Sequence, residues 1–569
     1  MEKRVILAVA LCVGILFVWT KYVQPPPPAP TPSPSVASPA EAGARPGKDT
    51  AGPPPSAAAA PGDATATGQA AGQAGGGAPS SYPEELTTLT TASQRFVFSS
   101  RGASLLHVTM REPKYLRTKN DPDSGVDVLR TASAHQGDFR VAFPDSGFAT
   151  PAEDAWHRVD SPVRDEVVYR AEVGAVVIEK RFRIDSTRYR VHLDVTIDNR
   201  SAKSLDHHLA ISVFGHQDPE AKGGFLSGST GNTANILCHL NDKTERTTVE
   251  NIYKESFEKI GAVSWLGADE KFFLAAAVPY PETPARERKC GGKASDPHTA
   301  EGQLSFAERQ LAPGAQTQYA FAIFVGPKVI SDLDEVRPGG TDVKLTEACD
   351  VSLAFISRPM LSLLKIFHGV VGNWGVAIIL LTVFIKLLTF YPTQKSLLSA
   401  KKMQKLGPKM AAIRKKYEND KQRQSVETMN LYKANGVSPF GGCLPSLIQM
   451  PIWIALYSTL NYAVELYRSP FMLHIHDLTA KDPYYLTPLL MGGVMFIQMK
   501  MSPTSPDNQQ QATMAVMMPV MFTAFSLVLP SGLAVYMLTS YLIGIVQQLL
   551  VNYLDRRSQS GPAPAVSRG

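Results

Sequence analysis

The chain has 569 residues, with 57 Lys and Arg against 51 Asp and Glu, and only five Cys. This length allows about three or four domains, and so few cysteines in a long chain exclude a small fold held together by disulfides. The mean hydropathy of −0.08 conceals a division. Residues 25–80 are almost without large apolar side chains, whereas residues 374–551 contain several apolar runs of membrane length. The sequence therefore predicts a membrane protein with a large polar insert.

The first 80 residues are predicted to form an anchor followed by a tether. Residues 1–24 hold an apolar stretch after Lys3 and Arg4, and no site of small residues suited to cleavage follows it. A retained signal anchor with a cytoplasmic N-terminus is therefore expected. In residues 25–80, 39 of 56 positions are Pro, Gly or Ala. Such a segment cannot bury enough apolar area to offset its chain entropy, so a disordered spacer is expected.

Residues 81–349 have the pattern of a β-rich domain. Apolar and polar residues alternate over ten positions at 189–198, which is typical of a half-buried antiparallel strand. Further strands are expected at Val176–Ile184, Phe272–Val278 and Gln318–Val325. Together these segments predict a β-sandwich.

No catalytic constellation is recognisable in this domain, and no metal site is expected. The candidate metal ligands are His207, His208, His216, Cys238 and His239. They lack the usual spacing of zinc ligands, so they are expected to be ordinary surface side chains. An oxidising compartment would favour one disulfide among Cys238, Cys290 and Cys349, and the sequence leaves open which pair forms it.

Five further spans are predicted after an interfacial helix. The segment 350–372 is amphipathic, with Phe355 and Leu363 on its apolar side and Arg358 and Lys365 on its polar side, so it is expected to lie in the membrane interface. The spans follow at 374–391, 442–463, 484–500, 512–529 and 533–551. Each is about 17–22 residues long, near or below the usual length of about 20.

The charge of the connecting segments predicts the orientation. Residues 393–441 hold 11 Lys or Arg and three acids, a net charge of +8, which exceeds the +6 of the whole chain. The positive-inside rule therefore places a segment at 392–441 in the cytoplasm, together with the short tail at 555–569. With six spans and both termini inside, the β domain is expected in the periplasm, and the five-span core covers 373–554.

The basic segment is predicted to be a helical hairpin. Met403, Leu406, Met410, Ile413 and Tyr417 follow the 3-4 spacing of a packed seam, and a polar turn precedes a second helix. Its lysine-rich faces are either simply solvated or a docking arm for an acidic partner such as the ribosome. No recognition of a specific nucleic-acid sequence is expected.

Lys386 is the most informative residue of the core, since a cation within a span is costly unless it reaches water. Snorkelling to lipid headgroups is one interpretation. However, Thr382 and Thr389 share its helical face, and a polar stripe of two turns favours a wet protein cavity over lipid. Possible partners on the other spans are Gln449, Pro451, Gln498, Tyr536 and Ser540.

The predicted membrane core contains a series of motifs, which are, in order, Gly372-Asn373-Trp374-Gly375, Lys386, Asp420-Lys421-Gln422-Arg423, Tyr432-Lys433, Pro439-Phe440-Gly441-Gly442-Cys443-Leu444-Pro445, Gln449-Met450-Pro451-Ile452, Ile475-His476-Asp477-Leu478, Asp482-Pro483-Tyr484-Tyr485, Met501-Ser502-Pro503 and Pro530-Ser531-Gly532-Leu533. In these motifs the chain resembles the YidC/Oxa/Alb family of membrane protein insertases in its Gram-negative form. These motifs cover about 350–555. The resemblance of the β domain is one of position and class.

The resemblance implies an inner-membrane protein that inserts and helps to fold nascent membrane proteins, alone or with the Sec translocon, and in contact with membrane lipids. It implies five helices around a hydrophilic groove, with the groove cation at Lys386 and lining positions at Thr382, Gln449, Met450 and Tyr536. Met537 departs from the pattern, because an aromatic residue is common there. The apolar span of a client is expected to slide along an apolar surface of Met450, Met537 and Leu538 into lipid. The mechanism expected is physical, so the chain is not expected to be an enzyme and no cofactor is required.

The sequence fits two other classes of membrane protein less well. An intramembrane serine protease would use Ser531 or Ser540 with a histidine, but the histidines lie in interfacial or outer segments and no GxSxG-type site is present. A secondary transporter or channel would use Lys386 as its ion site and predicts interrupted helices in two repeated halves, which the sequence does not display.

Overall fold

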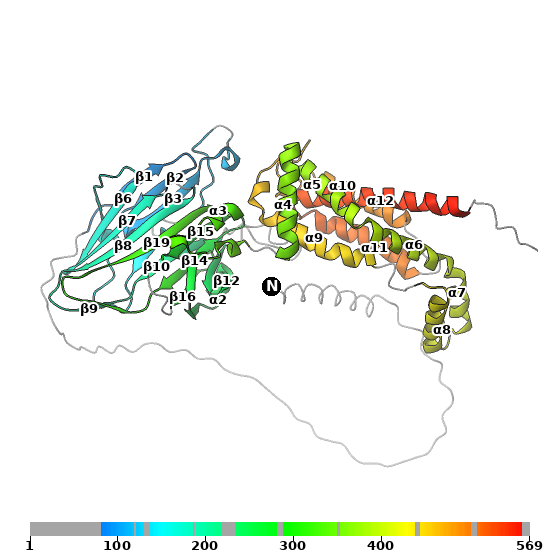
Figure 1. Ribbon diagram of the computed structural model, residues 1–569, viewed down its shortest axis with the longest axis horizontal. Helices are drawn as coiled ribbons and strands as arrows, with labels where there is room; N and C mark the ends of the chain where they lie inside the picture. Colours follow the sequence, from blue (N-terminus) through cyan, green and yellow to red (C-terminus); the bar gives the residue numbers. More distant parts are fainter. Residues whose placement is uncertain are drawn as a thin grey trace, which may run out of the picture. The chain divides into compact units, whose positions relative to one another are not determined.

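The computed structural model describes residues 81–118, 121–129, 136–185, 188–217, 234–281, 288–349, 353–437, 444–501 and 509–559. The predicted anchor at 1–24, the tether at 25–80 and most of the tail at 555–569 lie outside the described residues. Figure 1 shows the described part as a β-rich region followed along the chain by helices.

Two large antiparallel sheets form the β domain of the described chain. The nine-stranded sheet has the order β12 (Lys243–Thr248), β11 (Asn235–Leu240), β14 (Val263–Asp269), β15 (Phe273–Pro279), β19 (Gln316–Pro327), β8 (Arg190–Asn199), β7 (Val176–Ile184), β6 (Glu166–Val173) and β5 (His157–Val159). The five-stranded sheet has the order β13 (Phe257–Gly261), β16 (Arg288–Asp296), β17 (Thr299–Ser305), β10 (Ala210–His216) and β4 (Arg140–Ala142).

Smaller elements complete the domain. A three-stranded sheet comprises β1 (Leu86–Thr90), β2 (Gln94–Ser99) and β3 (Ser104–Met110), and a two-stranded one pairs β18 (Arg309–Leu311) with β9 (Leu205–His207). Two short helices are α2 (Val249–Lys254) and α3 (Ile330–Asp334). The large sheets pack on each other where β10 and β17 meet β14, and their apolar faces share one core that includes Trp265, Tyr319 and Phe182.

The four predicted strands are confirmed as β7, β8, β15 and β19, and their bounds shift by two residues at most. Alternation along β8 holds except at Asp194, which was expected to be exposed. Asp194 is only 8% exposed, because His192 lies 3.1 Å and Arg183 3.8 Å from its carboxylate oxygens. A charged network on the outer face therefore covers this position.

The expectation of surface histidines was wrong for His207 and His239, which are both about 1% exposed. The His207 ring lies 2.9 Å from the Tyr319 hydroxyl through Nε2, and the His239 ring stacks on Trp265 with a centroid separation of 5.6 Å. One ring nitrogen of His207 thus has a polar partner, whereas both ring nitrogens of His239 are buried without a hydrogen bond among the described residues. Residue type and spacing did not reveal this packing.

A disulfide joins Cys238 of β11 to Cys290 of β16, whereas Cys349 is a free thiol. The bond links the nine-stranded sheet to the five-stranded sheet, so it fastens the two layers of the domain together. The sequence had left the pair undecided.

The helical part contains α4 (Ala354–Val371) and the core helices α5 (Trp374–Leu388), α9 (Leu444–Tyr462), α10 (Leu486–Met501), α11 (Gln509–Ser526) and α12 (Ser531–Gln559). These correspond to the predicted interfacial helix and five later spans. By length and hydropathy, one described helix qualifies as a span, Ser531–Tyr553, and a second qualifies if α5 and α6 (Phe390–Lys405) count together across their 62° bend. Helices α10 and α11 contain shorter apolar stretches, Leu486–Met501 and Val516–Ser526.

The basic segment contains α7 (Gly407–Lys416) and α8 (Lys421–Ala434), which pack on each other beyond α6 (Figure 1). The Asp420 side chain caps α8 by accepting from the Arg423 amide at 2.9 Å. The predicted seam is present where the Tyr432 hydroxyl lies 3.2 Å from Met410 Sδ. Val426 and Met429 of α8 are about half exposed, so α7 covers only part of the apolar surface of α8.

Reduction of the disulfide should destabilise the β domain. The bond closes a loop with a sequence separation of 52, and chain-entropy arguments assign such a cross-link about 4 kcal/mol of unfolding free energy. The purified full-length protein should therefore lose about this much on reduction, measured by denaturant unfolding and tryptophan fluorescence. The matched control is a Cys238→Ala, Cys290→Ala variant, whose stability should not respond to reductant.

Acid should also weaken the β domain. Burial, together with the charge of Arg309, lowers the pKa of His207 to about 4 from its ordinary value near 6.5. As the pH falls, the unfolded chain therefore binds a proton at His207 before the folded protein does. The free energy of unfolding is highest, as far as His207 contributes, above pH 6.5, and it decreases as the pH falls from 6.5 to 4. A His207→Gln variant should show a shallower loss over this range than the wild type, whereas His208→Gln should follow the wild-type curve.

Candidate functional site

Helix α5 carries Lys386 and begins at a side-chain cap. The Asn373 side-chain oxygen accepts from the Val376 amide at 3.1 Å, and its nitrogen donates to the Phe471 carbonyl at 3.0 Å. The cap thus sets the start of α5 and ties it to the loop before α10. Lys386 lies 12 residues after Trp374, about 18 Å along the helix and in its last turn before the bend.

Lys386 is the first member of a polar chain that crosses three helices. Its Nζ donates to Oε1 of Gln449 on α9 at 3.5 Å, and Nε2 of Gln449 donates to the hydroxyl of Tyr536 on α12. Tyr536 is 2% exposed, whereas Lys386 and Gln449 are half-buried. The chain therefore runs from a partly accessible ammonium into the interior of the helical core.

The Lys386 ammonium is under-satisfied. Its bond to Gln449 is long for a hydrogen bond from a charged donor, which is usually 2.7–2.9 Å. Among the described residues, no carboxylate lies within ion-pair distance of it. An ammonium group has three donors, so a half-buried lysine with one neutral partner needs water, a lipid phosphate or an acidic ligand to complete its shell.

Of the two threonines in the predicted stripe, Thr382 lies on α5 and Thr389 is the residue that caps its C-terminal end, and both hydroxyls bond to the backbone of α5. The Thr382 hydroxyl donates to the Ile378 carbonyl at 2.7 Å, and the Thr389 hydroxyl donates to the Ile385 carbonyl at 2.8 Å. Their oxygens keep lone pairs that can accept further bonds. Thr382 is fully buried and Thr389 is half-buried, so only Thr389 is accessible beside the cation.

The surface of α5 next to Lys386 is apolar and exposed. Four of its side chains are between 38% and 68% exposed, namely Val383, Phe384, Leu387 and Leu388. Lys386 thus lies at the border between an exposed apolar surface and the polar chain.

The remaining predicted residues divide into accessible and buried ones. Met450 is 43% exposed and Pro451 is also exposed, next to Gln449 at the start of α9. Met537 is only 5% exposed, because it packs in the helical core. The expectation that Met537 offers an open apolar path together with Met450 and Leu538 is therefore wrong for Met537.

Gln498 and Ser540 do not take part in the described polar chain. Gln498 lies against Gly544 of α12, where a Cβ would come within 2.2 Å of its side-chain nitrogen. Ser540 is 7% exposed. The absence of a side chain at Gly544 thus allows α10 and α12 to approach each other.

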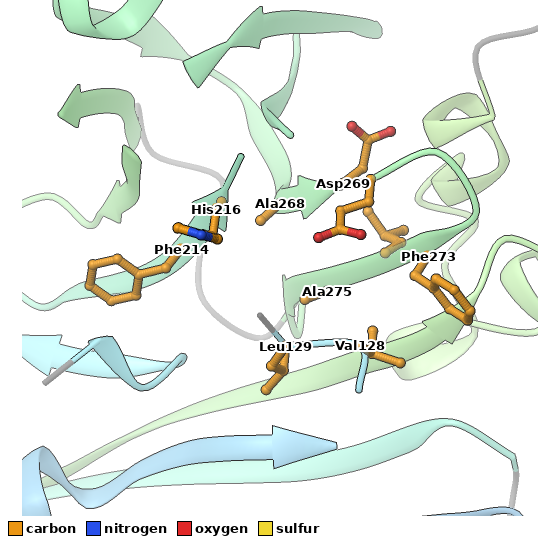
Figure 2. Close-up of a pocket in the computed structure, with 11 residues that line it drawn as sticks. Val128, Leu129, Phe214, His216, Ala268, Asp269, Phe273 and Ala275 are labelled. Carbon is orange, nitrogen blue, oxygen red and sulfur yellow. The ribbon is translucent and has the colours of Figure 1, made fainter. Parts of the chain in front are cut away.

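The β domain has a small cavity between its sheets, shown in Figure 2 with Asp269 and His216 at its wall. Its volume of about 20 Å³ is enough for a single water molecule. The Asp269 carboxylate is engaged by Lys328 at 3.0 Å, Arg246 at 2.5 Å and the Asn235 amide at 2.8 Å. Three partners therefore hold this carboxylate, and the cavity beside it is too small for a molecule larger than water.

Two features of the site were missed from the sequence. Gln449 and Tyr536 were named as separate candidates, but their mutual bond depends on how α9 packs against α12. Asn373 was noted only within a motif, although an Asn directly before an apolar helix is a recognised start signal and could have indicated the cap.

Two family models match the chain. The model described as "60Kd inner membrane protein" covers residues 366–558, and the "YidC periplasmic domain" covers residues 86–363. The chain is therefore an inner-membrane protein with a β-rich periplasmic domain and a C-terminal helical core.

Relatives agree with both matches. Membrane protein insertase YidC of Anaeromyxobacter sp. (strain Fw109-5) is 34% identical over 506 residues, covering 86% of this chain and 87% of the relative. The protein of the same name from Syntrophus aciditrophicus (strain SB) is 33% identical over 578 residues, covering 97% and 99%. A crystal structure of an active YidC insertase with its first transmembrane domain resolved is 19% identical, with a TM-score of 0.36, and covers 83% of this chain and 95% of that one.

The chain belongs to the YidC family of membrane protein insertases. It is an insertase and not an enzyme, and its clients are nascent membrane proteins.

Removing the Tyr536 hydroxyl should loosen the helical core. Tyr536→Phe leaves the Gln449 amide without its partner, and a hydrogen bond between membrane helices contributes about 0.5–2 kcal/mol. The thermal midpoint of the purified protein should therefore fall. Tyr553→Phe on the same helix is the control, since Tyr553 is 61% exposed. An equal response of both variants would contradict the proposed role of this bond.

Proposed function

We propose that the insertase receives its clients in a hydrophilic groove whose positive charge is Lys386. The residues assigned to this groove are Thr382, Thr389, Gln449, Met450, Pro451 and Tyr536. The observation that supports the assignment is the half-buried ammonium with only Gln449 Oε1, at 3.5 Å, as its described polar neighbour. An ammonium that lacks a counter-ion of its own is suited to a transient one brought by a client.

The groove lowers the cost of moving a polar segment across the bilayer. A charged side chain costs about 2.5–3.5 kcal/mol at the centre of a helix that crosses lipid. A wet groove that reaches partway across, in a bilayer thinned by short helices, shortens the dry distance. Lys386 adds an attractive field for acidic residues of the passing segment. The client's own apolar span then leaves along Met450 and Leu538 into lipid.

We infer a six-span topology with both termini in the cytoplasm. The proposed parts are the anchor at 1–24, the tether at 25–80, the β domain at 81–349, the interfacial helix at 350–372, the five-span core at 373–554 and the tail at 555–569. The hairpin at 392–441 is assigned to the cytoplasm because its net charge is +8. The 62° bend between α5 and α6 agrees with a helix that leaves the membrane at that point.

The basic hairpin is the proposed contact with the ribosome. Its helix α7 ends with Arg414, Lys415 and Lys416, and cations in a last turn are also favoured by the helix dipole. An anionic surface such as ribosomal RNA would attract these charges without reading a nucleotide sequence. The Sec translocon and membrane lipids are further proposed partners.

The charge of Lys386 should matter most for acidic clients. Lys386→Ala removes the attractive field, so insertion of a client with an acidic translocated segment should slow about fivefold to tenfold. A client whose segment is made neutral by Asp→Asn and Glu→Gln changes should slow less than twofold. Insertion into proteoliposomes that contain the purified full-length protein measures both rates.

Lys386→Arg is the matched control, because guanidinium keeps the charge and should keep both rates near those of the wild type. Equal slowing of acidic and neutral clients by Lys386→Ala would rule out the electrostatic role.

A further inference from the structure

The segment after α9 belongs to two apolar cores at once. Val464 is fully buried in the core of the β domain, whereas Ala463 and Leu466 are buried in the helical core. The Tyr467 ring lies 5.0 Å from Phe272 of the β domain, measured between centroids. Residues 463–468 therefore form a junction, in which neighbouring side chains pack against different parts of the chain.

Two cations reinforce this junction from opposite sides. Lys114 of the β domain donates to the Val464 carbonyl at 2.7 Å, and Arg468 of the junction donates to the Leu116 carbonyl at 2.6 Å. Each side thus contributes one charged donor to the other side's backbone. Hydrogen bonds from charged donors are the stronger kind, so the exchange fixes the position of the segment.

Glu465 provides the charge at the centre of the junction. Its side chain is 14% exposed, and Oε1 lies 2.6 Å from Nζ of Lys365 on the interfacial helix α4. Burial lowers the pKa of Lys114 to about 8, and the Glu465 carboxylate opposes this shift. One carboxylate therefore acts on a cation of α4 and on a cation of the β domain.

Helix α4 is also attached directly to α9, by a hydrogen bond near its N-terminal end. The Ser357 hydroxyl donates to the Ala455 carbonyl at 3.1 Å, and Thr459 donates to the same carbonyl at 2.8 Å. Ser357 and Lys365 are eight residues apart, about 12 Å along α4. Two attachments at this separation set both the position and the tilt of α4 against α9, the helix that carries Gln449.

We propose that Glu465 is a positioning residue that couples the β domain and the interfacial helix to α9. Through Lys365 and the junction, Glu465 keeps α4 and α9 at their relative position while a client passes. The role of Glu465 is independent of the role assigned to Lys386, because the contacts of Glu465 lie in the junction at residues 463–468, which follows α9.

Hydrogen–deuterium exchange of the full-length protein in lipid nanodiscs tests the coupling. Glu465→Gln keeps the shape of the side chain and removes its charge, so amide exchange should rise about tenfold in two separate peptides, α4 and residues 112–117. Lys365→Met should raise exchange in α4 only, because Lys114 keeps its carboxylate. Lys365→Arg should behave as the wild type.

The control pair is Lys254 with Glu250, which has the same 2.6 Å separation but side chains that are 65% and 70% exposed. Glu250→Gln should leave both peptides unchanged, as exposed ion pairs contribute little. An increase confined to one peptide in Glu465→Gln would overturn the coupling.

An insertion assay separates a positioning role from a purely structural one. Glu465→Gln should slow acidic and neutral clients alike, about threefold or more, and Lys365→Arg should not slow either. If Glu465→Gln loosens both peptides but inserts both clients at the wild-type rate, the positioning role is refuted. Slowing of the acidic client alone would also refute it, since that pattern belongs to a charge acting on the client.

Discussion

The proposed groove depends on one constraint, a half-buried Lys386 ammonium that has no carboxylate partner among the residues that the structure describes. Placing Lys386 against hydrocarbon would cost a few kcal/mol, and the long bond to Gln449 offsets only part of this. Among the described residues, the core supplies a chain of neutral groups through Gln449 to Tyr536 rather than a counter-ion. A neutral environment keeps the positive field available, whereas a resident carboxylate would cancel it. The charge can therefore act on whatever enters from outside.

The rest of the core keeps this group in place. Asn373 fixes the start of α5, and the bend after Leu388 ends the helix just beyond Lys386. On α9, Gln449 lies near one end and the junction at 463–468 follows the other end. The β domain thus contacts the chain segment that continues from α9, the helix that carries Gln449. Its own stability is reinforced by the disulfide between its two large sheets.

The sequence predicted those features that follow from local pattern. Strands β7, β8, β15 and β19 and the core helices were located because apolar periodicity and span length are local properties. Features that depend on packing were not predicted. Asp194 and His207 are buried by neighbours that are distant in sequence or that form a network over the strand, and nothing in the alternation indicates this. The role of Glu465 was not predicted, because Lys365 and Lys114, the cations it acts on, lie 100 and 351 residues away in the sequence. Lys386 could be predicted, because a cation within an apolar run can be recognised in the sequence without knowledge of the fold.

The most direct measurement is the reactivity of a cysteine at position 386 toward a water-soluble maleimide, in a background without other free thiols. Leu387→Cys is the matched reference, because Leu387 is 68% exposed on the apolar side of the same helix. If the groove is wet, Lys386→Cys reacts at least tenfold faster than Leu387→Cys in the native membrane. Equal, slow labelling at both positions would place Lys386 in hydrocarbon and contradict the account.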